Sequence, residues 1–218
     1  PSECSWDLLY KELCKNKFSI ELCEKIGLVK KSTKGNYIDS FHGRIIFPIY
    51  NLQSDVIGFN SRLLPCFDDK RYKLPRYLLS LETEIFSRKL IHYGYNKTKK
   101  EIEKKNICIF VEGIFDFFRL YENGIKNCIP LLGGQFNDVK NVNTYFLMMD
   151  FDKAGIKYSS TIGSKLISEN KVVRICNNKK DPDDLTRPEI IKSIKESQDF
   201  VDWYINKIYK YEDSIEHK

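Results

Sequence analysis

Residues 107–113 read ICIFVEG, an apolar run that ends in an acid and a glycine. Residues 145–152 read YFLMMDFD, so a second apolar run also ends in acids. A third run, Val172–Ile175, is followed by KDPDD at residues 180–184. Short apolar runs bounded by turn residues are typical of strands that are buried on both faces of a sheet. These three segments therefore predict the central strands of the fold.

The segments between these runs have helical patterns. Phe115–Asn123 is predicted to be a helix that stops at Gly124, and Ala154–Glu169 is predicted to be another. Cys128–Leu132 supplies one more strand between them. Strands that alternate with helices form right-handed crossovers and a mainly parallel sheet. We therefore predict an α/β fold in which helices flank a mainly parallel sheet.

Acidic residues stand just beyond the ends of the predicted strands. The carboxyl ends of parallel strands meet at one edge of a sheet, where α/β folds bind ligands. Clustered carboxylates resist ionising together unless a cation lies among them, and their hard oxygen atoms suit Mg²⁺ or Mn²⁺. The pattern predicts a two-metal site for phosphoryl transfer. Its candidate metal ligands are Glu112, Asp150, Asp152, Asp181 and Asp183.

The first third of the chain has a different pattern. Residues 1–30 are predicted to form two short helices, and Ile45–Tyr50 with Val56–Phe59 a β-hairpin. Pro48 cannot donate a ladder hydrogen bond, so its strand is expected at a sheet edge or at a bulge. Residues 62–90 read as irregular, basic chain.

Three parts of the chain follow from these patterns. Residues 1–95 form a smaller mixed α+β basic subdomain, and residues 96–186 form the metal-binding catalytic domain. Residues 187–218 form a C-terminal helical segment, which Pro188 opens and which continues through Tyr209.

Positive charge is concentrated in one segment. Arg62–Lys105 holds twelve Lys or Arg against six Asp or Glu, and this surplus equals the net charge of +6 of the whole chain. Aromatic residues are interleaved with these cations, and such a mixture tracks a phosphate backbone and stacks bases. The alternative is a solvated face with a few core aromatics. The candidate nucleic-acid or nucleotide contacts are Arg44, Arg62, Arg76, Tyr77, Arg88 and Lys89. For each cation the alternative is a plain surface charge, and for Tyr77 it is core packing.

Composition limits the class of protein. The 218 residues are 42% hydrophobic and 30% charged, which is ordinary for a soluble globular protein, and no apolar run reaches the roughly 18 residues of a membrane span. We expect a cytoplasmic protein with no membrane partner. The seven cysteines are widely spaced, so we expect reduced, buried, structural thiols and no zinc finger. The chain opens at Pro1 without a methionine, which favours a fragment or a processed product.

Six segments, in order, resemble the catalytic core of bacterial and phage DnaG-type DNA primases, whose catalytic half is a TOPRIM metal-binding domain. One alone is weak evidence, but all six with family-like spacing are strong. The segments are GRIIFPI (43–49) with VIGFNSR (56–62), PRYLLSLETEIF (75–86) with the Tyr93-Gly94 step, FVEGIFDFFRLYENGI (110–125), LLGG (131–134), MMDFDKAG (148–155) and KDPDDL (180–185).

The resemblance implies that the chain synthesises RNA primers on a single-stranded DNA template from ribonucleoside triphosphates. It implies two or more Mg²⁺ or Mn²⁺ ions, and a replicative helicase partner bound through segments outside this chain. The alternatives are a TOPRIM-type metal-dependent nuclease and a non-catalytic single-stranded nucleic-acid-binding module. Glu112, Asp150 and Asp152 are the catalytic candidates, and Glu112 is either a metal ligand or a general acid/base.

Three further residues are expected to support the site. Gly113 and Gly133 permit tight turns after their strands. Asp116 either assists the metal ligands or caps its own helix. Where the family commonly has glycine between the two aspartates, this chain has Phe151, which either packs under the site or narrows the nucleotide pocket.

Overall fold

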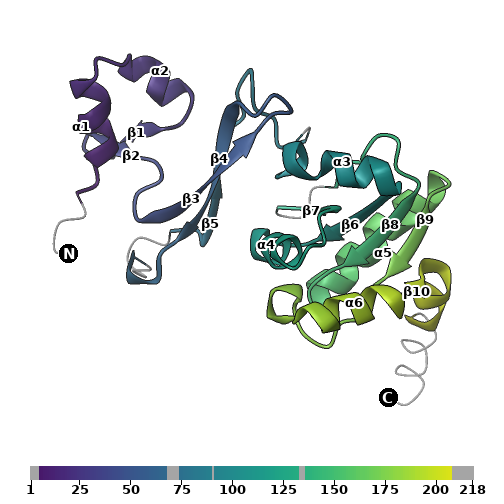
Figure 1. Cartoon of the computed structure of the whole chain (residues 1–218). Helices are drawn as coiled ribbons and strands as arrows, with labels where there is room; N and C mark the ends of the chain where they lie inside the picture. The colour runs from purple at the N-terminus through teal and green to yellow at the C-terminus, as the bar shows by residue number, and fades with distance from the viewer. Residues whose placement is uncertain (1–4, 68–73, 90, 133–135, 208–218) are drawn as a thin grey trace. The chain divides into compact units, whose positions relative to one another are not determined.

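The computed structural model describes residues 5–67, 74–89, 91–132 and 136–207, and the chain divides into two compact units, residues 1–91 and residues 92–218. Each sheet lies within one unit, and each unit is described by itself (Figure 1). The sequence-based limits at residues 95 and 186 stay predictions.

The second unit is built on a five-stranded sheet with the order β10-β9-β8-β6-β7. Its strands are β6 (Ile107–Val111), β7 (Cys128–Pro130), β8 (Thr144–Met148), β9 (Val172–Ile175) and β10 (Gln198–Asp199). The pairs β6–β7, β6–β8 and β8–β9 are parallel, and β10 lies antiparallel to β9. The mainly parallel sheet predicted from the apolar runs is therefore confirmed.

Helices flank this sheet (Figure 1). They are α3 (Tyr95–Lys105), α4 (Ile114–Glu122), α5 (Lys153–Ser168) and α6 (Arg187–Lys195), with the 3₁₀ turn η2 (Pro182–Asp184) before α6. The C-terminal helical segment is present, but it is not continuous. After α6 the chain adds β10 to the sheet edge and becomes helical again over residues 200–207.

The core of the second unit holds the strand ends in place. Four of the five residues of β6 are buried, as expected for a strand covered on both faces. Phe110 of β6 stacks on Tyr145 of β8 with ring centroids 5.7 Å apart. Leu166 of α5 and Trp203 pack into the same cluster. The first residues of the loops that follow these strands are therefore held in place by the core.

The strand order creates a switch point at β6 and β8. From β6 the chain moves to β7 on one side of β6, and it then crosses to β8 on the other side. Val111 and Met148, the last residues of β6 and β8, lie opposite each other in the parallel register. In open α/β sheets, ligands bind beyond the carboxyl ends of the strands at such a point.

The first unit contains two helices and two small antiparallel sheets. Its elements are α1 (Leu8–Lys15), α2 (Ile20–Lys25), β1 (Val29–Lys31), β2 (Tyr37–Asp39), β3 (Arg44–Tyr50), β4 (Val56–Leu63), η1 (Pro65–Phe67) and β5 (Tyr77–Leu79). The two helices and the β3–β4 hairpin are confirmed, and Pro48 lies on an edge strand as expected. The prediction of irregular chain over residues 62–90 was wrong at Tyr77–Leu79, where β5 pairs with β4.

The described cysteines are all free. Cys23, Cys108, Cys128 and Cys176 are buried, as expected for structural thiols. The expectation of burial was wrong for Cys14 and Cys66, which are exposed. Across the described ranges, none of the helices combines the length and the apolar character that crossing a bilayer requires.

Candidate metal site at the carboxyl end of the parallel sheet

The five candidate metal ligands lie on loops at one edge of the second unit's sheet. Glu112 directly follows β6, and Asp150 follows β8 by two residues, so both stand at the switch point. Asp152 is the N-cap of α5. Asp181 and Asp183 lie at the start of η2, after β9.

Asp152 is held by the helix that it caps. Its Oδ1 accepts a hydrogen bond of 2.8 Å from the Gly155 N–H, which satisfies one of the free donors in the first turn of α5. A Cβ at Gly155 would lie 2.1 Å from the carbonyl oxygen of Asp150. Only glycine therefore lets α5 approach the Asp150 backbone this closely.

A backbone hydrogen bond joins the loop after β8 to the loop after β9. The Phe151 N–H donates to Oδ1 of Asp181 at 3.0 Å. The Phe151 side chain is 66% exposed, which excludes the interpretation that it packs under the site. The ring instead stands in solvent between the two aspartates of β8's loop.

The carboxylates are close enough to disturb one another's ionisation. Burial, followed by the charges of Asp116, Glu112, Asp181 and Asp152, raises the pKa of Asp150 to about 7. Burial, followed by the charges of Asp152 and Asp181, also raises the pKa of Glu112. Among the described residues, only burial and other acids account for these shifts, and a bound cation would relieve such a cluster.

Two oxygen atoms of this group are buried with no hydrogen-bond partner among the described residues: Oε2 of Glu112 and Oδ1 of Asp150. Buried polar atoms in proteins nearly always have a partner, so each exception needs an explanation. Hard, anionic oxygen atoms without partners fit Mg²⁺ or Mn²⁺. Within the described ranges, however, no three Asp, Glu, His or Cys side chains already form a closed set of metal ligands.

Asp116 connects two of the loops, and both of its oxygens are occupied. Oδ2 accepts from the Gly113 N–H at 2.7 Å, and Oδ1 accepts from the Asp183 N–H at 3.1 Å. Burial is the main reason why the pKa of Asp116 is raised to about 7. The geometry has features of both roles expected for Asp116. The side chain closes the first turn of α4, and it also holds the backbone of Asp183, a candidate metal ligand.

The cationic candidates lie in the first unit, around β4 and β5. The guanidinium groups of Arg62 and Arg76 lie 5.8 and 5.9 Å from the centroid of the Tyr77 ring, which is 42% exposed. Arg44 donates to the carbonyl of Pro75 at 2.7 Å and so also supports the chain that leads into β5. These residues form one cationic and aromatic surface.

Arg88 and Lys89 follow on the chain after β5. Arg88 donates to the carbonyl of Ser80 at 3.2 Å, and its Nε lies 3.9 Å from Glu82. Lys89 is exposed. Gly133, the remaining candidate, lies outside the described residues.

Two family models match the chain in succession. "DNA primase catalytic core, N-terminal domain" matches residues 2–99, and "Toprim-like" matches residues 109–186. The chain belongs to the DnaG-type DNA primase family. The two matched ranges extend over both units, and the second contains all five candidate carboxylates.

Curated DNA primases are similar along nearly the whole chain. The DNA primase of Synechocystis sp. is 31% identical over 230 residues, which cover 94% of this chain and 35% of the relative. The DNA primase of Staphylococcus epidermidis is 29% identical over 216 residues, which cover 93% and 35%. The chain therefore spans about a third of the length of these primases.

Solved primase structures share the fold. The zinc-binding and RNA polymerase domains of the Aquifex aeolicus primase align with a TM-score of 0.78 at 26% identity, covering 96% of this chain and 54% of that one. A DNA primase domain from Pseudomonas aeruginosa aligns with a TM-score of 0.77 at 26% identity, covering 93% and 67%. The TOPRIM-type fold expected from the motifs is thereby shown.

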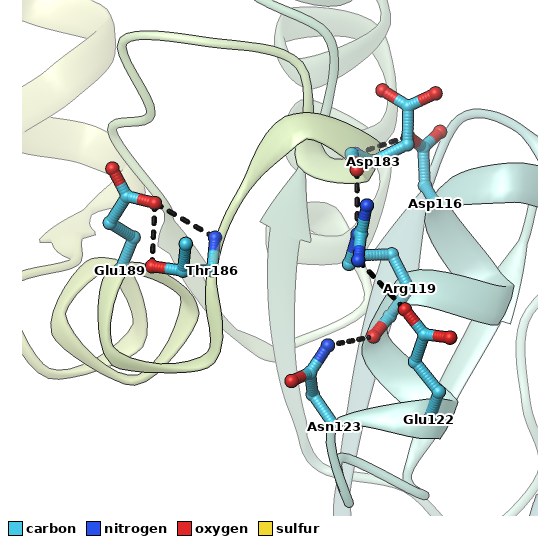
Figure 2. A network of polar contacts seen from close by, with 7 residues as sticks. All are labelled: Asp116, Arg119, Glu122, Asn123, Asp183, Thr186 and Glu189. Atoms are coloured by element: carbon cyan, nitrogen blue, oxygen red, sulfur yellow. Dashed lines mark hydrogen bonds and ion pairs between the residues drawn. The ribbon is translucent and has the colours of Figure 1, made fainter.

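Two residues that bear on the primase-like site were missed from the sequence. Gly155 stands three residues after Asp152, so its position in the first helical turn was a usable signal for a capped N–H. Arg119 of α4 donates through Nε to the Asp183 carbonyl at 2.6 Å (Figure 2). Because 64 residues separate the partners, no local pattern could have indicated that contact.

Proposed function

We propose that this chain is the RNA-synthesising core of a primase and extends a primer on single-stranded DNA by nucleotidyl transfer. The observation that supports this most is the set of carboxylates at the β6/β8 switch point, where Glu112 and Asp150 carry buried oxygens with no described partner. Mg²⁺ or Mn²⁺, with two or more ions, is the cofactor that suits these residues.

The reaction joins a 3′-hydroxyl oxygen to the α-phosphorus of a ribonucleoside triphosphate. The bond between that phosphorus and the bridging oxygen breaks, pyrophosphate leaves, and the hydroxyl proton passes to solvent. Glu112, Asp150 and Asp152, with Asp181 and Asp183, would hold the ions. When bound, such ions lower the pKa of the attacking hydroxyl and stabilise the leaving oxygens.

The protein's own part is to keep these acids in place. Asp152 is fixed by the Gly155 N–H, and Asp181 by the Phe151 N–H. Preorganised groups lower the activation barrier because less entropy is lost, and less reorganisation is needed, when the transition state forms.

We infer that the cationic and aromatic surface of the first unit contacts the template or the triphosphate. Arginine grips phosphate oxygens with two donors, and Tyr77 offers an exposed ring to a base. A DnaG primase catalytic domain that shares this fold, with a TM-score of 0.75, has been solved bound to ssDNA. A replicative helicase remains the expected partner through segments outside this chain.

An extension assay tests the proposal. A 5′-labelled single-stranded oligonucleotide that folds back on itself is incubated with ribonucleotides and Mn²⁺ or Mg²⁺. We expect metal-dependent lengthening, and its loss in Glu112→Gln and in Asp150→Asn. Asp184→Asn is the matched control, since Asp184 is an exposed acid of the same turn outside the candidate set.

The alternatives give different products in the same assay. Metal-dependent shortening of the oligonucleotide would identify a nuclease. Binding without any change in length, at every metal concentration tested, would identify a non-catalytic module.

A further inference from the structure

One helix holds the backbone of Asp183 by both of its polar groups (Figure 2). The Asp183 N–H donates to Oδ1 of Asp116 at 3.1 Å. The Asp183 carbonyl accepts from Nε of Arg119 at 2.6 Å. Asp116 and Arg119 are three residues apart on α4 and therefore share one face of the helix. We name these two side chains the α4 clamp.

Each side chain of the clamp also contacts a further group. Asp116 is only 5% exposed, and its second oxygen accepts from the Gly113 N–H next to Glu112. Arg119 pairs through Nη1 with Glu122 at 2.8 Å, one turn along the helix (Figure 2). The clamp therefore couples the loop of Glu112 to the turn of Asp183.

The turn is also tied down at its other end. Oδ1 of Asp181 accepts the Phe151 N–H, and Thr186 with Glu189 closes a capping box at the start of α6. The Thr186 N–H and hydroxyl both donate to Oε2 of Glu189, at 2.8 and 2.7 Å (Figure 2). Between these two anchors, the α4 clamp ties the middle of the turn to α4.

We propose that Asp116 and Arg119 are positioning residues that set the affinity of the metal held through Asp181 and Asp183. This rests on the proposed function of the carboxylate site. A metal-ligating residue whose backbone is already ordered loses little conformational entropy when the metal binds. Loosening the clamp should therefore weaken metal binding although every ligating side chain is still present. Groups that orient metal ligands typically contribute about 10- to 100-fold to metal affinity.

The test is Mn²⁺ binding to the whole chain, measured by electron paramagnetic resonance of the free ion. Arg119→Lys keeps the positive charge and the aliphatic stem but removes the Nε donor. We expect it to weaken Mn²⁺ binding about 10-fold. Glu122→Gln is the matched control, because it removes the ion pair and leaves the Nε–H to Asp183 bond in place. It should change the affinity less than about twofold.

Asp116→Asn adds a second test, since an amide offers one acceptor oxygen where the carboxylate offers two. We expect a loss of affinity between 10- and 100-fold. Thermal unfolding is recorded for every variant. In addition, extension by Arg119→Lys should return to the parent rate at saturating Mn²⁺, which a damaged catalytic group would not allow.

The outcomes separate the two proposals. Binding by Arg119→Lys that equals the parent's, where Glu112→Gln and Asp150→Asn both weaken it, overturns the clamp and leaves the proposed function standing. A parent chain that binds no Mn²⁺ overturns both. If Glu122→Gln weakens Mn²⁺ binding as much as Arg119→Lys does, the clamp is also overturned. The loss of affinity would then come from the Arg119–Glu122 ion pair.

Discussion

The charged side chains of the two units stand in opposite surroundings. In the second unit, Glu112 and Asp150 are half-buried among other acids, and their pKa values are raised. In the first unit, Arg76 is exposed at a ring face, and Arg44 reaches backbone carbonyls. The half-buried acids therefore lower the stability of the second unit, whereas the exposed cations have little effect on the stability of the first. Substitutions should show the same contrast.

The largest effect is expected where the acidic loops meet α5. Gly155→Ala would place a Cβ 2.1 Å from the Asp150 carbonyl oxygen, so the backbone must move. We expect a loss of about 3 kcal/mol in the free energy of unfolding of the second unit. Extension activity should fall by more than about 100-fold as Asp150 moves. Ser164→Ala, at an exposed position on the same helix, should change neither the free energy of unfolding nor the extension activity. Equal stability of the two variants would contradict the close approach of α5 to the Asp150 carbonyl.

A gain in stability is expected from removing the acid itself. Because burial and neighbouring acids raise the pKa of Asp150 to about 7, the folded state holds a proton that the unfolded state releases near its ordinary value of 3.8. Stability through this residue therefore falls as the pH rises from about 4 to about 7 and stays low above that.

Without metal at pH 8, Asp150→Asn should be more stable than the parent by about 1–2 kcal/mol, after discounting for solvent screening. The difference should vanish near pH 4. Denaturant unfolding at both pH values measures it, and a variant less stable than the parent at pH 8 would be the wrong sign.

A smaller effect is expected in the first unit. Arg76→Ala should weaken binding of single-stranded DNA by about threefold to tenfold and reduce the salt slope by about 1, as the loss of one phosphate contact does. Thermal stability should not change. Lys34→Ala is the control, since Lys34 is an exposed cation of the same unit outside the candidate set. Identical salt slopes for the two variants in fluorescence anisotropy would remove Arg76 from the interface.

The smallest effect is expected at Phe151. Since the ring is 66% exposed, Phe151→Ala should change the free energy of unfolding by no more than about 0.5 kcal/mol. On the remaining interpretation, that the ring narrows the nucleotide pocket, KM for ribonucleoside triphosphates should fall. Steady-state extension kinetics measure this, and an unchanged KM would place the ring away from the nucleotide.

The long apolar runs made the parallel sheet predictable. Strands such as Ile107–Val111 are buried on both faces, and this leaves a clear pattern in the sequence. The acids that follow them could be identified as one group because parallel strands end at one edge. The short strands β5 and β10, of three and two residues, leave no such pattern and were missed.

Contacts made by single side chains over long separations were not predictable. Nothing near Arg119 indicates that it meets the carbonyl of Asp183. The exposure of Phe151 was needed to exclude packing under the site, and the role of Gly155 needed the position of the Asp150 carbonyl. The sequence predicted the candidate groups, and packing determines how they are held.

We expect burial and mutual repulsion of the acids to destabilise the second unit until a divalent cation binds. Trp203 is 6% exposed in the core of that unit, so in a Trp6→Phe background its fluorescence follows the unfolding of the second unit. Mn²⁺ at 100 times its dissociation constant should stabilise this unit by about 2.7 kcal/mol. At the same Mn²⁺ concentration, Asp150→Asn should gain far less. An equal gain in both proteins, or none in the parent, would contradict the account.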